Sequence, residues 1–458
     1  MRSRIRMVVV GAFIGGLLFA RIVDAGDSAV ASPRSPADFR EVIQRAKDRV
    51  FPALVHVRCI RETRERGKRE TVQVGGSGVL ISRDGEFLTN WHVVRNAVDV
   101  RCLLFDGRAF SARVVGTDQD TDLGVCRIEA PADTTFPWAE LGDSKALVEG
   151  DFVMAMGAPW GMSRSVSLGM LSCARRYLTD HSEYSLWLQT DAAISPGNSG
   201  GPLVNTEGRV VGINARGVMR GGDMGFAIPS STIAQVLDPI RKHGRVPWAW
   251  TGLRLQPLQD FSRNMYFGGT RGVIVTGTDP DSPARETGIQ PNDRIVSVGG
   301  TPVTAQMSED LPALRRMLAL LSPGSPVKLD IQRGEEHLEI SITPREKGRT
   351  EGEELDLPRW GFSVKQINRF ASPSLHAHRK HGLFVHGVKR PGNARDAGLR
   401  ENDILLRIGK AEIATLDDLR TQHTKALKNL KDRSWVLITV LRGGLMRQVV
   451  LDFGRDYE

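Results

Sequence analysis

The sequence predicts a mainly β protein, in which an all-β sandwich or barrel is followed by two copies of a smaller domain. Between residues 53 and 228 the chain has many short alternating or apolar segments, separated by Gly, Asp and Asn turns. Clear helical periodicity is confined to a short stretch on either side of this region. The last part of the chain contains an internal repeat, which indicates a duplicated domain.

Length and composition place the chain among multi-domain globular proteins. Its 458 residues suggest about three domains. The apolar content of 40% and the charged content of 25% are ordinary, which excludes disordered and collagen-like classes. The net charge of +9 is modest for this size, and the sequence has no aromatic-basic module. Nucleic acid is therefore not an expected partner.

The first residues have the order of a secretory signal. A basic start is followed by an apolar stretch at residues 7–20 and by small residues around position 25. The apolar stretch is short for a membrane-spanning helix, which needs ~20 residues. We expect a signal peptide at residues 1–25 that is cleaved on export to the periplasm or cell envelope. The alternatives are secretion and, less favoured, retention as an N-terminal anchor.

Residues 26–50 are expected to form a leader and then a helix, because Phe39, Val42, Ile43 and Ala46 share one helical stripe. Pro52 should close this helix. The next domain is predicted at residues 51–244, with strands at 54–57, 78–81, 100–104 and 210–213. A second helix is expected at 231–243, with Ser230 or Ser231 as its N-cap and Gly244 after its end.

The repeat is visible in two matched segments. Residues 284–295 resemble residues 394–405 at an offset of 110 residues, and residues 250–253 resemble 359–362 at an offset of 109 residues. Two markers at nearly the same offset indicate two copies of one domain. We place them at residues 246–345 and 358–455, joined by a charged linker at 346–357.

The chain has four cysteines, none of them in a CxxC pair, so a zinc site is not expected. They are Cys59, Cys102, Cys126 and Cys173, each within a predicted strand or strand end. An exported compartment permits disulfides. The sequence leaves open whether a pair is bridged or all four are buried thiols. It suggests no metal and no cofactor.

A candidate nucleophile lies in residues 195–203 (SPGNSGGPL). A catalytic serine needs exposure on a tight turn and nearby backbone N–H groups for a developing oxyanion. Glycines beside Ser199 allow such a turn. We therefore expect Gly197, Asn198 and Ser199 to form an oxyanion hole, with its donors at Gly197 and Ser199. Alone, this segment is equally consistent with an ordinary turn.

A serine nucleophile needs a base, and the base needs an orienting carboxylate. His92 follows an apolar strand, and Asp122 begins another. Asp118 and Asp120 are rivals for the carboxylate, but they lie in the polar loop before that strand. The order His92, Asp122, Ser199 is that of chymotrypsin and not that of the subtilisins or α/β-hydrolases, and it agrees with the β-rich pattern.

These motifs together resemble the HtrA (Deg) family of exported serine proteases. The resemblance rests on residues 89–93 (TNWHV), 121–125 (TDLGV), 189–203 and 225–229 (GFAIP), and it extends over nearly the whole mature chain. Two departures are Ser195, where the family usually has Asn, and Gly124, where it usually has Ala. Neither affects the proposed triad.

The resemblance implies a chymotrypsin-like double β-barrel followed by two PDZ-like α+β domains. It also implies a homotrimer or higher oligomer, and unfolded or damaged proteins as substrates. It places the specificity pocket beside residues 213–217. Because no Asp stands there, we expect a small aliphatic residue at the cleaved position.

In PDZ domains a peptide adds as a strand to a sheet edge, and backbone N–H groups bind its C-terminal carboxylate. We expect these carboxylate-binding loops at Thr251, Gly252 and Leu253 and at Trp360, Gly361 and Phe362. The alternative interpretation is that each of these segments is simply the start of a strand. Residues 61–70, rich in both charges, are interpreted as a solvated loop; the resemblance offers regulation of assembly instead.

The absence of a P-loop motif agrees with proteolysis that needs no ATP. The expected function is an ATP-independent serine endopeptidase for protein quality control. The alternatives are a site-specific protease in stress signalling and a chaperone in which proteolysis is secondary.

Overall fold

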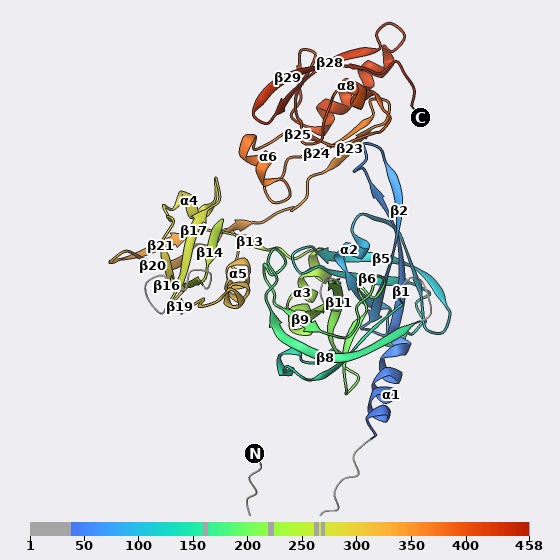
Figure 1. Ribbon diagram of the computed structural model, residues 1–458, viewed down its shortest axis with the longest axis vertical. Helices are drawn as coiled ribbons and strands as arrows, with labels where there is room; N and C mark the ends of the chain where they lie inside the picture. Colours follow the sequence, from blue (N-terminus) through green and yellow to red (C-terminus); the bar gives the residue numbers. More distant parts are fainter. Residues whose placement is uncertain (1–37, 159–163, 219–223, 261–264, 267–270, 458) are drawn as a thin grey trace, which may run out of the picture.

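The computed structural model describes residues 38–158, 164–218, 224–260, 265–266 and 271–457. The predicted signal peptide lies outside the described residues. Two closed six-stranded barrels are followed by two α+β units, which confirms the predicted fold class (Figure 1). The described residues contain no helix that is both long and apolar enough to cross a membrane.

The first barrel begins after helix α1 (Phe39–Val50), whose N-cap Asp38 accepts a hydrogen bond from the amide of Arg40 at 3.0 Å. Pro52 lies in the short helix η1 (Phe51–Ala53), which ends α1 as expected. The barrel closes in the order β1-β2-β3-β6-β5-β4. Its strands are β1 (Leu54–Thr63), β2 (Glu70–Leu80), β3 (Glu86–Asn90), β4 (Ala97–Leu103), β5 (Ala109–Asp118) and β6 (Leu123–Glu129).

The second barrel closes in the order β10-β11-β12-β9-β8-β7. Its strands are β7 (Phe152–Gly157), β8 (Ser165–Arg176), β9 (Trp187–Thr190), β10 (Pro202–Asn205), β11 (Val210–Val218) and β12 (Met224–Pro229), with η2 (Ser144–Ala146) before them. Helix α3 (Ser230–His243) follows where a helix was predicted. Its N-cap is Pro229, not Ser230 or Ser231, because the Ser230 hydroxyl instead donates to the carbonyl of Gly142 at 2.7 Å.

The first repeat is built on a sheet in the order β14-β17-β18-β20-β21, with β19 paired to β18. Its strands are β14 (Leu253–Gln256), β17 (Val273–Thr278), β18 (Arg294–Val298), β19 (Thr301–Pro302), β20 (Val327–Arg333) and β21 (Glu336–Ile342). Its helices are α4 (Pro283–Glu286), η4 (Ser308–Asp310) and α5 (Leu311–Ala319). Two small ribbons accompany it, β13 (Ala249–Trp250) with β22 (Arg345–Glu346) and β15 (Gln259–Asp260) with β16 (Met265–Tyr266).

The second repeat has the order β23-β24-β25-β26-β28-β29, with β27 paired to β26. Its strands are β23 (Glu354–Leu357), β24 (Phe362–Gln366), β25 (Leu383–Val388), β26 (Ile404–Ile408), β27 (Ala411–Glu412), β28 (Trp435–Arg442) and β29 (Leu445–Asp452). Its helices are α6 (Pro373–His378), α7 (Asn393–Asp396) and α8 (Leu416–Lys428). The expected linker at 346–357 therefore holds a strand of this sheet.

A buried ion pair recurs in both repeats and supports their common descent from one domain. In the first repeat Asp293 binds the guanidinium of Arg333, at 2.7 Å to one carboxylate oxygen and 2.8 Å to the other. In the second, Asp403 binds Arg442 at 2.6 Å through each oxygen. Both aspartates are buried, so each needs such a partner in place of water.

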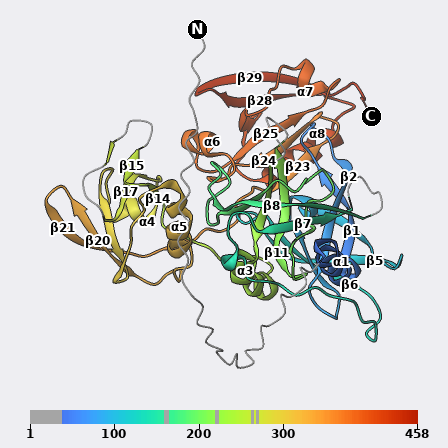
Figure 2. The same cartoon turned by 60° about the horizontal axis from the view of Figure 1, so that its bottom comes forward.

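The tip of the β1–β2 hairpin packs against the second repeat, as both views of the chain show (Figures 1 and 2). The carbonyl of Glu65 lies against Gly387, where a side chain would collide with it, and Gly67 lies against the backbone of Lys389. The interpretation of residues 61–70 as a solvated loop is therefore wrong for its tip, which is an interdomain contact.

All four cysteines lie in strands and are free thiols, Cys59, Cys102 and Cys126 being buried and Cys173 partly exposed. Burial raises the pKa of Cys59 to about 11 and that of Cys102 to about 12. Of the two possibilities that the sequence left open, the structure therefore has four free thiols and no disulfide between these cysteines.

Candidate active site

His92 and Asp122 meet at one end of the first barrel. His92 lies in the short helix α2 (Trp91–Val94) directly after β3, and Asp122 directly precedes β6, the strand paired with β3. The imidazole Nδ1 lies 3.0 Å and 2.8 Å from the two carboxylate oxygens. The backbone amide of His92 also donates to Asp122 Oδ1 at 3.1 Å. This arrangement leaves Nε2 to face away from the carboxylate, as a general base requires.

A tight loop fixes Asp122 itself. Its backbone has a φ of +57°, which few residues other than glycine adopt easily. The carboxylate of Asp118 supports this loop by accepting bonds from the amide and hydroxyl of Thr121, at 3.0 and 2.6 Å. Asp118 therefore shapes the loop and does not contact His92, and the rival assignment to Asp118 loses its geometric basis.

Ser199 lies on the turn between β9 and β10 of the second barrel. The next residue, Gly200, has a φ of +87°, and a side chain there would collide with the carbonyl of Ser77 and the hydroxyl of Thr89. Glycine is therefore required for the turn to approach the first barrel. The two barrels thus supply different parts of the site.

Ser77, in β2, joins the nucleophile turn to the first barrel and was missed by the sequence reasoning. Its amide donates to the carbonyl of Ser199 at 2.8 Å, and its hydroxyl donates to the carbonyl of Gly197 at 2.7 Å. Thr89 in turn donates to the carbonyl of Ser77 at 2.8 Å. The only sequence signal was the surrounding glycine-rich string at residues 75–78.

Asn214 supports the turn from the other side and was also missed. Its carbonyl accepts from the amide of Gly200 at 2.8 Å, and its side-chain amide donates to the carbonyls of Met156 and Pro202 at 3.2 and 3.1 Å. The side chain of Asn214 is fully buried. These contacts hold three segments of the second barrel in register beneath Ser199.

Two amides of the turn are available for an oxyanion. Within the described part of the chain, the N–H groups of Gly197 and Ser199 have no hydrogen-bond partner. The amide of Asn198 differs, because it donates to the carbonyl of Ser195 at 2.9 Å. The amide of Asn198 is thus used within the turn, and the assignment of Gly197 and Ser199 as the oxyanion donors stays a prediction.

The hydroxyl of Ser199 donates to the carbonyl of Ala215 at 3.2 Å. Among the described residues, no hydrogen bond joins this hydroxyl to His92. Catalytic hydrogen bonds are often long or misaligned before substrate binds, so this geometry does not count against the predicted pairing of Ser199 with His92.

The segment expected to form the specificity pocket, residues 213–217, lies in β11 beside the turn. At Gly217 a side chain would collide with the carbonyl of Ile194, so this wall is made by backbone. The guanidinium of Arg216 lies 6.0 Å from the ring of Trp187 and 3.3 Å from His181. No Asp or Glu stands in this segment, which leaves the pocket wall without a negative charge.

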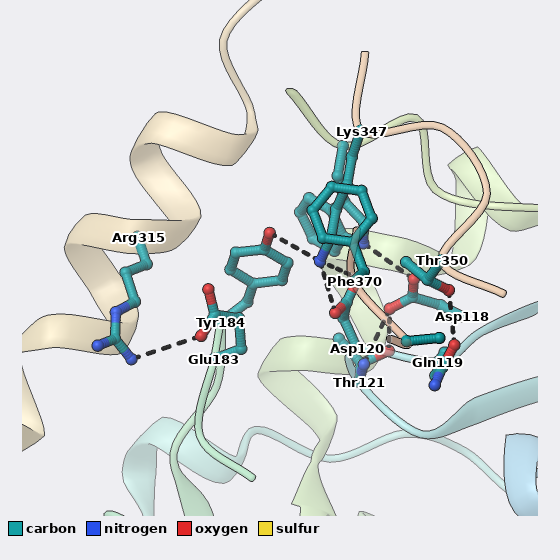
Figure 3. A network of polar contacts seen from close by, with 12 residues as sticks. Asp118, Gln119, Asp120, Thr121, Glu183, Tyr184, Arg315, Lys347, Thr350 and Phe370 are labelled. Atoms are coloured by element: carbon teal, nitrogen blue, oxygen red, sulfur yellow. Dashed lines mark hydrogen bonds and ion pairs between the residues drawn. The ribbon is translucent and has the colours of Figure 1, made fainter. Parts of the chain in front are cut away.

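A buried ion pair joins the segment after the first repeat to the loop before Asp122 (Figure 3). The Nζ of Lys347 lies 2.7 and 2.9 Å from the carboxylate oxygens of Asp120 and 3.2 Å from the Tyr184 hydroxyl. Burial alone would lower the pKa of Lys347, but the charge of Asp120 reverses this and the pKa is raised. Asp120 therefore holds a domain contact and is no candidate for the triad.

The two expected carboxylate-binding loops differ. Gly252 has a φ of +74° and, in the described part of the chain, its amide has no partner. Thr251, Gly252 and Leu253 line a cavity of about 410 Å³ with Leu255 and Leu318. Gly361 has a φ of +78°, but its amide already donates to the carbonyl of Leu357 at 2.8 Å, and its neighbours Trp360 and Phe362 are fully buried.

No cluster of His, Cys, Asp and Glu suited to a metal ion occurs among the described residues.

Comparison with known families agrees with this geometry. The model of the trypsin-like peptidase domain matches residues 76–213, and the PDZ domain model matches residues 251–343. The first match includes His92, Asp122 and Ser199, and the second includes the Gly252 loop.

Similar proteins extend over most of the chain. It is 33% identical over 432 residues to a probable periplasmic serine endoprotease, DegP-like, from Chlamydia trachomatis, covering 93% of this chain and 84% of the relative. A DegP-like relative from Pseudomonas putida is 35% identical over 395 residues, with coverage of 83% and 79%.

Two solved structures are similar. The HtrA-type protease AlgW with a decapeptide has a TM-score of 0.57 and 28% identity, covering 66% of this chain and 98% of that one. A serine endoprotease from Yersinia pestis has a TM-score of 0.53 and 29% identity, with coverage of 68% and 99%.

Proposed function

The chain belongs to the HtrA (DegP-like) family of serine endoproteases, and we propose that His92, Asp122 and Ser199 are its catalytic triad. The observation that carries this proposal is the pair of contacts from His92 Nδ1 to both carboxylate oxygens of Asp122, at 3.0 and 2.8 Å. That geometry suits an imidazole whose second nitrogen accepts a proton. Ser199 supplies the nucleophile, and the amides of Gly197 and of Ser199 itself have no partner among the residues that the structure describes.

The reaction then follows the order of serine-protease chemistry. Ser199 Oγ attacks the peptide carbonyl while His92 takes its proton, and Asp122 stabilises the resulting imidazolium. The amides of Gly197 and Ser199 bind the oxyanion. His92 next protonates the leaving amine, and water hydrolyses the acyl-enzyme. The 5% exposure of the Asp122 side chain supports this orienting role, because its carboxylate is shielded from water.

The first repeat is proposed to bind the C-termini of substrate or regulatory peptides. Its outer strand β14 has no neighbour on one side within the described sheet, as strand addition requires. The amide of Gly252 and the leucines of the adjoining cavity suit a carboxylate and an apolar terminal side chain. The similar AlgW structure contains a decapeptide.

The broader role that we propose is ATP-independent quality control of unfolded or damaged exported proteins. The names of the relatives support a periplasmic or envelope location. An assembly of three or more copies through the protease domains is part of this proposal. A small aliphatic preference at the cleaved residue fits the absence of Asp and Glu from residues 213–217, because no carboxylate stands there to bind a basic side chain.

The test is degradation of unfolded casein by the purified mature chain without ATP, beside Ser199→Ala. Loss of a triad serine lowers turnover by about a million-fold, so the variant should show no cleavage. Ser195→Ala is the matched control: it removes an exposed hydroxyl from the same turn and should retain activity. Equal cleavage by the unmodified chain and by Ser199→Ala would refute the assignment.

A further inference from the structure

The two repeats differ at the sheet edge where a PDZ-type domain receives a peptide. β14 is the outermost strand of the first repeat, whereas its counterpart β24 carries one more strand, β23, on the same side. A peptide ligand in such a domain adds as a strand to this edge. In the second repeat the chain itself therefore occupies the position of a ligand.

The pairing of β23 with β24 is antiparallel and continuous over four residues, from Glu354 opposite Lys365 to Leu357 opposite Phe362. The first of these pairs is also an ion pair, at 3.0 Å, between side chains that are mostly buried. Opposite charges directly across two strands favour one register. β23 is thus fitted to this edge in one defined alignment.

The side chains of β23 alternate between the domain core and the protease. Leu357 is 1% exposed within the hydrophobic core of the second repeat, and Leu355 packs partly buried against the same core. Both leucines pack beside residues of helix α8. An apolar C-terminal side chain of a peptide ligand would be buried in the same way, in a groove between the edge strand and a helix. The strand is held by packing as well as by backbone pairing.

The loop that would receive a carboxylate is also engaged. The amide of Gly361 donates to the carbonyl of Leu357 at 2.8 Å and lies 3.1 Å from that of Pro358. In the first repeat the equivalent amide of Gly252 has no partner within the described residues. A free carboxylate could reach Gly361 only after Leu357 had left.

We propose that residues 354–357 are the resident ligand of the second repeat, so that this domain excludes external peptides and leaves their capture to the first repeat. The proposal replaces the expectation that Trp360, Gly361 and Phe362 bind the carboxylate of another chain. It rests on the proposed function only for the role of the first repeat.

The resident strand also connects the second repeat to the protease domain. Asp356, between the two leucines, points to the opposite side and binds the guanidinium of Arg64 at 3.1 Å. The hydroxyl of Ser363, on β24, donates to the carbonyl of Arg64. The β1–β2 hairpin thus rests on the face of β23, β24 and β25 that lies opposite the groove.

Hydrogen exchange of the full chain, read by mass spectrometry, tests this proposal. Ser199→Ala prevents self-digestion, and the probe is a synthetic peptide of residues 350–357 (TEGEELDL) with a free C-terminal carboxylate. We expect residues 361–366 to be protected without the probe and unchanged by it. In Leu355→Asp/Leu357→Asp the same residues should exchange at least about tenfold faster and regain protection when the probe is added.

Asp356→Asn is the matched control on the same strand. It should leave residues 361–366 protected while the hairpin tip at residues 64–69 exchanges faster, because the variant loses the ion pair with Arg64 but keeps the packing of Leu355 and Leu357. Rapid exchange at 361–366 in the unmodified chain, or further protection there by the probe, would overturn the proposal. Protection in α8 and β28 shows whether the double variant remains folded. If the variant is unfolded, the exchange at 361–366 in the unmodified chain, with and without the probe, decides the proposal.

Exchange at residues 252–256 reports separately on the first repeat. Failure of that repeat to bind the probe would leave the result at 361–366 intact, so the two proposals stand or fall independently.

Discussion

Breaking the buried pair between Lys347 and Asp120 should destabilise the contact between the first repeat and the protease domain. The two side chains are only 10% and 16% exposed. Two unit charges 4 Å apart attract by ~4 kcal/mol at an effective dielectric constant of 20. Removing one member of a buried pair costs about 3–5 kcal/mol, because the other charge is left without a partner. We expect this cost for Lys347→Met.

The assay is hydrogen exchange at the amide of residue 347, which donates to the carbonyl of Trp248 at 2.8 Å. A loss of about 3 kcal/mol corresponds to exchange faster by about a hundredfold. The double variant Lys347→Met/Asp120→Asn should lose much less stability at this contact than the two single variants lose in sum, because neither charge then remains buried without a partner. Coupling between such neighbours is commonly about 0.5–3 kcal/mol.

Lys328→Met supplies the control, because Lys328 pairs with Glu339 at 2.8 Å but both side chains are more than half exposed. Surface pairs contribute little, so no measurable change is expected. Equal effects of the Lys347 and Lys328 variants, or strict additivity in the double variant, would refute the reasoning.

Three further predictions concern the turn, the loop and the thiols. Gly200→Ala should lower kcat/KM by about a hundredfold or more, since the new methyl group meets the carbonyl of Ser77 and displaces the nucleophile; Gly150→Ala, with open space around it, should not. Burial, with the charge of Asp120 adding to it, raises the pKa of Asp118 to about 6, above its value of about 3.9 in the unfolded chain. The folded chain then holds an extra proton between about pH 4 and 6, so this stability is complete below pH 4 and is lost as the pH rises through 6. Between about pH 4 and 6, thermal unfolding should show that the unmodified chain loses roughly 2–3 kcal/mol of stability relative to Asp118→Asn. A gain of stability relative to Asp118→Asn over the same pH range would contradict the raised pKa. Iodoacetamide should label Cys173 alone in the folded chain and all four cysteines after unfolding.

Local patterns were sufficient to predict the elements that depend on them. Alternation and turn residues predicted parts of β1, β2, β4 and β11, and the 3.6-residue period predicted α1. Helix α3 was recognised as a helical stretch that ends before Gly244. The serine turn, the histidine and the aspartate were recognisable because each needs particular neighbours in the chain. Their roles also required an order that only the combination of three motifs provides.

Contacts made by distant segments were not predictable from such patterns. In the sequence Ser77 is an ordinary small residue in a glycine-rich strand. Its two hydrogen bonds to the turn of Ser199 form only when the two barrels pack together. β23 was interpreted as a linker because Glu354 and Asp356 are charged. Their charges are matched by Lys365 and Arg64, which stand on another strand and another domain.

The division of the site between two barrels has a consequence for the life of the chain. His92 and Asp122 are synthesised within the first barrel, but Ser199 and its supporting Asn214 come much later. On the proposed triad, a chain that ends before the second barrel would carry the base without the nucleophile, so we expect it to be unable to cleave other chains. The hydroxyl of Ser77 reaches the carbonyl of Gly197 only once both barrels have folded, so we expect activity to appear after the second barrel is complete.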